Sequence, residues 1–184
     1  MDARLFVALW PDGGAIGRLS PEIERARGQA GDAVRWQPPE RWHITMAFLG
    51  QADPARSAQR IAHAARGDGL GPVGDLRLCG SGTFGPIIWI GVEHGPQLAD
   101  LAVGLQRILR TEDRRFRAHV TVGRVRGAQA PRIARSAAQL LAEHRGPGWT
   151  PRELTLVEST TGPHPAYRVL ERWPLPSAPG ADAR

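Results

Sequence analysis

The chain has 184 residues, of which 41% are hydrophobic and 23% are charged, and its net charge is +6. This length predicts one domain or two small lobes, and the composition excludes a disordered chain. No apolar run approaches the roughly 18–20 residues that a membrane-spanning helix needs, and a single cysteine excludes an intrachain disulfide.

All 24 basic residues are arginines. Codon bias in a GC-rich genome is the simplest cause of the missing lysines. The positive charge still favours anionic partners, because the guanidinium fork can donate two hydrogen bonds to one phosphate. The opening residues lack the pattern of a signal peptide, so we expect a cytoplasmic protein.

The start of the chain predicts a strand followed by a short helix. Residues 4–11, RLFVALWP, are an apolar run that stops at a Pro-Asp-Gly-Gly sequence, which is typical of a buried strand and a turn. Residues 21–27 predict one or two helical turns. Ser20 would cap this helix and Pro21 would take its first position.

The next segments predict three strands and a helix. Residues 42–50, WHITMAFLG, have the composition of a strand. Asp53 then stands at the N-cap position of a helix over residues 54–66, which begins with proline. Residues 75–79 and 87–92 predict two further strands, joined as a hairpin through the glycine-rich stretch between them.

The second half of the chain follows a similar order. Residues 96–110 have leucine and isoleucine at helical spacing, residues 115–125 predict a strand, and residues 131–144 predict another helix. Residues 152–160 and 166–175 predict two closing strands.

Each half therefore holds a strand, a helix, a strand with His-x-Thr and a second helix. This order predicts a duplication, with two similar lobes around one cleft. We expect a single bilobal domain over residues 1–176 and a disordered tail over residues 177–184, which are rich in proline, alanine and glycine.

The repeated His-x-Thr sequence carries the candidate chemistry. Side chains on a strand alternate between faces, so His43 shares a face with Thr45, and His119 shares a face with Thr121. If the two strands face each other across a cleft, two imidazoles and two hydroxyls meet there. Histidine titrates near pH 6.5 and hydroxyls donate to anionic oxygens, so this set suits acid–base chemistry on a phosphodiester.

Arg124 is a candidate for binding the phosphate. It stands five residues after His119, and this odd separation places it on the opposite face of a regular strand. A bend at Gly123 would bring its guanidinium round to the phosphate.

Zinc binding is the rival use of two histidines. Zinc takes three or four protein ligands, and the sequence has no His-x-His, Cys-x-x-Cys or His-Glu-x-x-His pattern. We therefore expect no metal and no other cofactor. The remaining histidines are expected at the surface: His63, His94, His144 and His164.

The two motifs, WHITMAFLG and AHVTVGR, resemble the paired motifs of the 2H phosphoesterase superfamily. The resemblance is to its RNA 2′,3′-cyclic phosphodiesterases, also called 2′-5′ RNA ligases, and extends to RLFVALWP and to the closing strands. It implies an α+β fold, with two pseudo-symmetric lobes of antiparallel sheet and outer helices around a basic central cleft.

The resemblance also implies a role for each candidate residue. His43 would donate a proton to the leaving ribose oxygen and His119 would activate water. Thr45 and Thr121 would bind phosphate oxygens. Two positions further along the motifs also match the family: Arg124 matches a basic position, and Phe48 matches an aromatic position that could stack on a base.

The leading hypothesis is a metal-independent enzyme that opens 2′,3′-cyclic phosphates at RNA ends to 2′-phosphates. One alternative is a related enzyme that acts on another small cyclic nucleotide or on a 2′-5′ linkage, including ligation. The other alternative is a module that binds RNA ends or nucleotides without turnover. Binding alone, however, needs no acid–base pair. We expect a monomer whose partners are RNA ends or cyclic nucleotides, with no membrane.

Overall fold

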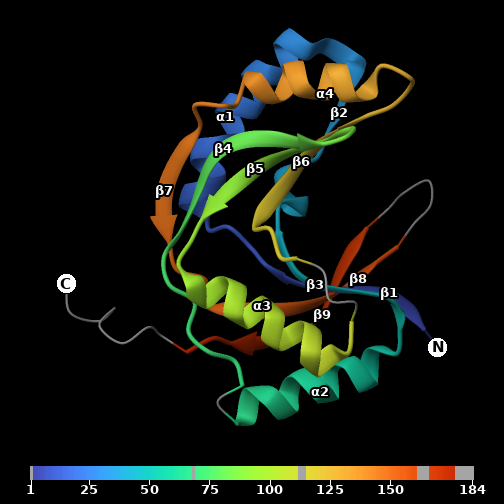
Figure 1. Cartoon of the computed structure of the whole chain (residues 1–184), viewed down its shortest axis with the longest axis vertical. Coiled ribbons are helices and arrows are strands. Elements are labelled where there is room, and N and C mark those ends of the chain that lie inside the picture. The colour runs from blue at the N-terminus through green and yellow to red at the C-terminus, as the bar shows by residue number, and fades with distance from the viewer. Residues whose placement is uncertain (1, 68, 112–114, 161–165, 177–184) are drawn as a thin grey trace.

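Figure 1 shows the computed structural model of the chain, which describes residues 2–67, 69–111, 115–160 and 166–176. The described strands are β1 (Ala3–Leu9), β2 (Val34–Trp36), β3 (Ile44–Ala52), β4 (Leu76–Phe84), β5 (Ile87–Glu93), β6 (His119–Val125), β7 (Arg145–Trp149), β8 (Glu153–Ser159) and β9 (Tyr167–Pro174). The described α-helices are α1 (Gly13–Ala30), α2 (Pro54–Arg66), α3 (Pro96–Leu109) and α4 (Ala130–Gln139). No helix in these ranges is long and apolar enough to cross a membrane.

The strands form one antiparallel sheet with a palindromic order. The order is β7-β4-β5-β6-β3-β1-β8-β9, and β2 pairs with the far end of β6. Read outward from the centre, β6 corresponds to β3, β5 to β1, β4 to β8 and β7 to β9. The two central strands pair only at Ile44 and Val120, so the sheet divides there into two lobes. The expected α+β fold with two pseudo-symmetric lobes is confirmed.

The helices cross between the lobes. Helix α1 follows β1 in the chain but packs on β7, and α3 follows β5 but packs on β3. Helices α2 and α4 stay with the lobe of the strand that precedes them, so α2 lies beside α3, and α4 packs on β4 and β5. Figure 1 shows the result, with α1 and α4 on the upper lobe and α2 and α3 on the lower one.

Strand β1 shows how the sheet separates its two faces. Leu5, Val7 and Leu9 are fully buried in the main core beneath the helices. Phe6 and Ala8 alternate with them and pack in a second, smaller cluster on the opposite face, which faces the space between the lobes. Alternation along one strand therefore builds both the core and an apolar floor for the cleft.

The first helix is longer than the sequence predicts, and its expected cap is wrong. Helix α1 begins at Gly13, where the Asp12 carboxylate accepts a hydrogen bond of 2.8 Å from the Ala15 backbone N–H. Pro21 lies inside the helix rather than at its start. Its missing N–H and its ring disfavour this place, but the helix buries a continuous face against the upper lobe: Ala15, Leu19, Glu22, Ile23 and Ala26.

Other segments also differ from the expectation. Strand β4 continues through the glycine-rich stretch to Phe84, so the hairpin turn is confined to Gly85 and Pro86. Strands β2 and β7 were not predicted, and α4 ends five residues early, before a buried His144. The prediction for α2 is confirmed, since the Asp53 side chain accepts from the Arg56 backbone N–H at 2.7 Å.

Among the described histidines outside the cleft, His144 is buried, although it was expected at the surface. It is 3% exposed, and its Nδ1 lies 2.9 Å from the Glu22 carboxylate. Glu22 also pairs with Arg18 at 2.9 Å. The contact between Glu22 and His144 joins α1 to the residue that precedes β7. His164 and the expected tail over residues 177–184 lie outside the described residues.

Candidate active site

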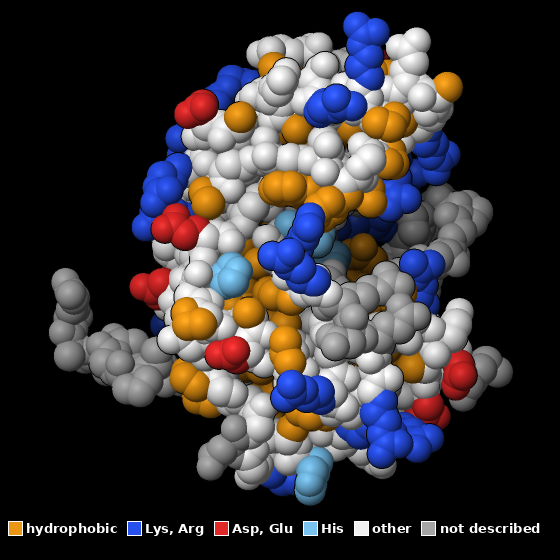
Figure 2. All heavy atoms as spheres, in the orientation of Figure 1, with side chains coloured by type: hydrophobic (Ala, Val, Ile, Leu, Met, Phe, Trp, Pro, Cys, Tyr) orange, Lys and Arg blue, Asp and Glu red, His pale blue; other side chains and the backbone are white. Residues whose placement is uncertain are grey.

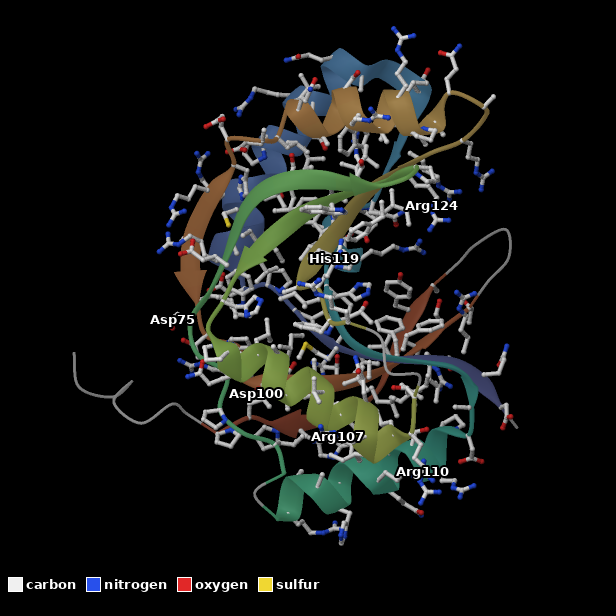
Figure 3. The ribbon with its side chains drawn as sticks, viewed as in Figure 1. Asp75, Asp100, Arg107, Arg110, His119 and Arg124 are labelled. Atoms are coloured by element: carbon white, nitrogen blue, oxygen red, sulfur yellow. The ribbon has the colours of Figure 1, made fainter. Side chains whose placement is uncertain are left out.

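The single pairing between the central strands brings the two motifs together. Ile44 and Val120 are directly opposite each other and fully buried. Directly opposed residues of an antiparallel pair share a face, and their chain neighbours point to the other one. The neighbours are His43 and Thr45 on one strand, and His119 and Thr121 on the other, so all four side chains face the cleft. Figure 3 shows His119 at this central position.

Two matching β-bulges follow the motifs. The register between β1 and β3 shifts so that Met46 has no partner, and the register between β5 and β6 shifts so that Val122 has none. Both extra residues come three positions after the histidine. A bulge reverses the alternation of the strand beyond it, and both strands therefore change face at the same point.

This reversal turns Phe48 and Arg124 toward the cleft side. Each lies five residues after its histidine and is exposed, while the residue before it is buried. Phe48 is paired with Phe6, which belongs to the apolar floor, and Arg124 is paired with Ile87. A regular strand would have hidden Arg124. The bulge at Val122, directly before Gly123, changes the direction of Arg124.

The two imidazoles are held in the same way. Nδ1 of His43 lies 2.7 Å from the Arg41 carbonyl oxygen, and Nδ1 of His119 lies 2.7 Å from the Arg117 carbonyl oxygen. A carbonyl can only accept, so Nδ1 carries the proton in both rings. In the neutral ring the lone pair is then on Nε2, which can accept a proton from a reactant.

The first histidine is enclosed by aromatic rings. Phe6 stacks on His43 at 4.7 Å between ring centroids, Tyr167 makes a T-shaped contact with it at 5.3 Å, and the Trp10 ring lies 5.4 Å away. Burial among these rings lowers the pKa of His43 to about 4. The Arg41 carbonyl opposes this shift, and the nearby charge of His119 adds to it. His43 is therefore neutral near pH 7.

The second histidine has a more open version of the same surroundings. Phe84 meets His119 edge-on at 5.1 Å, and Trp89 lies 6.5 Å away. The Arg117 guanidinium lies 5.9 Å from the Phe84 ring centroid. On the first side, the Arg41 guanidinium lies 5.3 Å from the Tyr167 ring. Each histidine thus makes a T-shaped contact with an aromatic ring, and the guanidinium of the arginine two residues before it lies over that ring.

Sequence reasoning missed these arginine–aromatic pairs, although one signal was present. Arg41 and Arg117 hold the same place in the two motifs, as Arg-x-His. The aromatic partners could not have been found in this way, because Tyr167 and Phe84 come from β9 and β4, far from the motifs in the chain.

A groove of about 840 Å³ opens from the site onto the lower lobe. Of the predicted site residues, it is lined by Thr45, Phe48 and His119. His43, Thr121 and Arg124 lie outside its lining. In Figure 2 the hollow between the lobes has histidine side chains at its floor and arginine side chains around it. Within the described ranges, no group of three or more His, Cys, Asp or Glu side chains could hold a metal ion.

Comparisons with known proteins show the family of this chain. The profile of the 2′-5′ RNA ligase superfamily matches residues 17–163. An RNA 2′,3′-cyclic phosphodiesterase of Archaeoglobus fulgidus is 30% identical over 91% of this chain and 97% of its own. A protein of the same name from Thermus thermophilus is 29% identical over 94% of this chain and 90% of its own.

Solved structures share the fold. E. coli LigT complexed with 3′-AMP superposes with a TM-score of 0.72 at 22% identity, over 95% of this chain and 99% of LigT. TT0787 of Thermus thermophilus gives 0.71 at 24% identity, over 95% of this chain and 98% of its own.

Proposed function

Because the chain belongs to the 2′-5′ RNA ligase superfamily, a family of enzymes, we propose that it hydrolyses 2′,3′-cyclic phosphate ends of RNA to 2′-phosphates. The reaction would use two histidines and no metal ion. The observation that carries this proposal is the matched pair of imidazoles, each with Nδ1 bound to a carbonyl oxygen and both on one face of the sheet. Binding alone needs no such pair.

The cyclic phosphate would lie between the two lobes. His119 takes a proton from water through Nε2, and the water attacks phosphorus. His43 gives a proton to the ribose oxygen that leaves on the opposite side. The hydroxyls of Thr45 and Thr121 donate to the two oxygens that stay on phosphorus, where negative charge grows.

The burial of His43 bears on its role. A general acid must be protonated before it acts, and a pKa of about 4 leaves His43 neutral near pH 7. A bound phosphodiester places a negative charge beside the ring, and an opposite charge at short range raises the pKa of an imidazole. The acid role of His43, taken from the family resemblance, therefore requires the substrate to supply this charge.

The position of the two histidines makes the product specific. In-line attack breaks only the bond opposite the incoming water. If that bond joins phosphorus to O3′, as the family resemblance implies, the product is a 2′-phosphate. Phosphorus NMR of a hydrolysed cyclic nucleotide separates this isomer from the 3′-phosphate.

Substitution of each histidine tests the pair. We expect His43→Gln and His119→Gln each to lower turnover of adenosine 2′,3′-cyclic phosphate by about 10²–10⁴-fold, the usual worth of a positioned acid or base. The double variant should lose little more than either single one. His63→Gln, on the exposed side of α2, is the matched control. Near wild-type turnover by either folded single variant would contradict the pair.

The two roles are separated by a substrate whose leaving group needs no proton. An aryl phosphodiester with a nitrophenolate leaving group should restore much of the relative rate of the variant that lacks the acid. It should not restore the variant that lacks the base. If the activated substrate restored the relative rate of His119→Gln instead of that of His43→Gln, the acid would be His119 and the base His43, and the proposal of a histidine pair would still hold.

A further inference from the structure

The groove extends well beyond the cyclic phosphate. From Thr45 it follows β3 past Phe48 to Ala52 and the start of α2, and its other wall is the end of α3. At about 3.3 Å per residue, the stretch of β3 from Thr45 to Ala52 spans roughly 20 Å. Stacked bases are about 3.4 Å apart along a strand, so the groove has length for several nucleotides.

The lining of the groove is basic. Among the described lining residues, five arginines face two carboxylates. One carboxylate, Asp53, already accepts a hydrogen bond from the α2 backbone as its cap. The arginines are Arg56, Arg60, Arg110, Arg115 and Arg117. Figure 2 shows arginine side chains gathered at the lower right, where Figure 1 places the adjacent ends of α2 and α3.

The arginines at the outer end differ in how free they are to bind a ligand. Arg60 donates to the Leu109 carbonyl oxygen at 3.3 Å, so it also joins α2 to α3. Arg56 and Arg110 are exposed and stand on opposite walls, one in the first turn of α2 and the other just after α3. Figure 3 shows Arg110 at the α3 end beside α2, with Arg107 further back on the helix.

The groove also holds an aromatic side chain. Phe48 is 49% exposed, and the Arg4 guanidinium lies 5.3 Å from its ring centroid. Aromatic faces with arginines along a track are the usual means of binding single-stranded nucleic acid without reading its sequence. An exposed phenylalanine between the cleft and the arginines fits this pattern.

We infer that this groove binds the RNA strand upstream of its reacting end, with Arg56 and Arg110 contacting phosphates at least one nucleotide away from the cyclic one. This inference rests on the proposed function for its direction. A 2′,3′-cyclic phosphate stands at the 3′ end of a strand, so all remaining nucleotides lie on its 5′ side and must leave the cleft along one path. The preferred substrate is then an oligonucleotide rather than a cyclic mononucleotide.

The test compares two substrates and two pairs of substitutions. Arg56→Ala/Arg110→Ala removes the outer arginines, and Arg66→Ala/Arg107→Ala removes exposed arginines of the same two helices that do not line the groove. The substrates are adenosine 2′,3′-cyclic phosphate and a tetra-adenylate that ends in the same group. Binding is measured separately, by fluorescence anisotropy of a 5′-labelled tetra-adenylate with a 2′-phosphate end, which is not turned over.

We expect the groove pair to weaken tetra-adenylate binding about tenfold at low salt, and to lower its kcat/KM by a similar factor. Turnover of the cyclic mononucleotide should stay within about twofold of wild type. The slope of log affinity against log salt should fall by about 1.4, since each lost phosphate contact on a single strand removes about 0.7. The control pair should bind as the wild type does.

Equal binding by the groove pair and the wild type, or an equal loss in both pairs, would overturn the inference. The two proposals fail separately. Groove-dependent binding without turnover of either substrate removes the proposed activity and keeps the groove. Turnover of both substrates at the same kcat/KM, unaffected by Arg56→Ala/Arg110→Ala, keeps the proposed activity and removes the groove.

Discussion

The enclosure of His43 predicts how the stability of the protein depends on pH. Phe6, Trp10 and Tyr167 surround the imidazole, and their burial of the ring is the main cause of its pKa of about 4. The unfolded chain holds the same ring in water, with a pKa near 6.5. The native state therefore binds this proton more weakly than the unfolded state does.

The sign and size follow from linkage. Stability from this histidine is fully present above about pH 6.5 and is lost as the pH falls through 6.5 toward 4. One pKa unit corresponds to 1.36 kcal/mol. At pH 5 the difference between the folded and unfolded pKa of His43 therefore lowers the free energy of unfolding by about 2 kcal/mol. Replacing His43 by glutamine removes the titrating group, and with it this part of the acid sensitivity.

The assay is urea unfolding at pH 7 and pH 5. Between these two pH values the free energy of unfolding of the wild type should fall by about 2 kcal/mol more than that of His43→Gln. At a typical urea slope for a protein of this size, this is a shift of about 1 M in the urea midpoint. His63→Gln, which removes an exposed imidazole of α2, should lose as much as the wild type. Equal losses in the wild type and His43→Gln would refute the claim that burial keeps this ring neutral.

Further expectations concern the groove, the second histidine, the buried pair and metal. Asp53→Ala removes the cap of α2 and should lower the free energy of unfolding by about 1 kcal/mol, measured by urea unfolding. Gly82→Ala adds a Cβ that overlaps the Trp89 ring; it should cost about 1–3 kcal/mol and lower kcat, because this indole packs beside the second histidine. Glu22→Ala leaves the buried His144 without its carboxylate and should cost about 1–3 kcal/mol, seen as a lower thermal midpoint. Turnover of a cyclic nucleotide should be unchanged by EDTA, and loss on chelation with recovery on adding metal would contradict the proton-transfer mechanism.

The sequence predicts the repeat and the cleft face well, because both depend on local order and alternation. His43 and Thr45 share a face by strand geometry alone, and so do His119 and Thr121. The meeting of the two pairs depends on a single bridge between Ile44 and Val120. Similar motifs in matching halves made that meeting a reasonable expectation.

The bulges lie beyond such reasoning. Nothing in the residue types around Met46 or Val122 indicates that Met46 will have no register partner on β1 and Val122 none on β5. The register that decides this is set by the neighbouring strands β1 and β5. The direction of Arg124 therefore needed the structure, and so did the aromatic rings that β4 and β9 bring to the histidines.

The predicted boundaries of helices and strands are wrong at some prolines and glycines, because tertiary packing there outweighs the local preference of these residues. Pro21 has the look of a first helical residue, yet it lies deep inside α1, because the apolar face of that helix extends to Ala15. Strand β7 contains Pro147 between two glycines and has the composition of a loop. It forms because it pairs with β4 at the edge of the sheet, where a proline is tolerated.

The crossing of α1 and α3 between the lobes has a consequence for any half of this chain. A fragment that ends after β4 would carry α1 with its apolar face uncovered, since the strand on which that helix packs, β7, belongs to the other half. Two identical half-chains of this kind would not supply that strand either, because the counterpart of β7 in the other lobe, β9, also follows β4 in the chain. Two identical halves would also give their two histidines the same surroundings. Fusion into one chain is what allows one histidine to be enclosed by aromatic rings while its counterpart stays open to solvent.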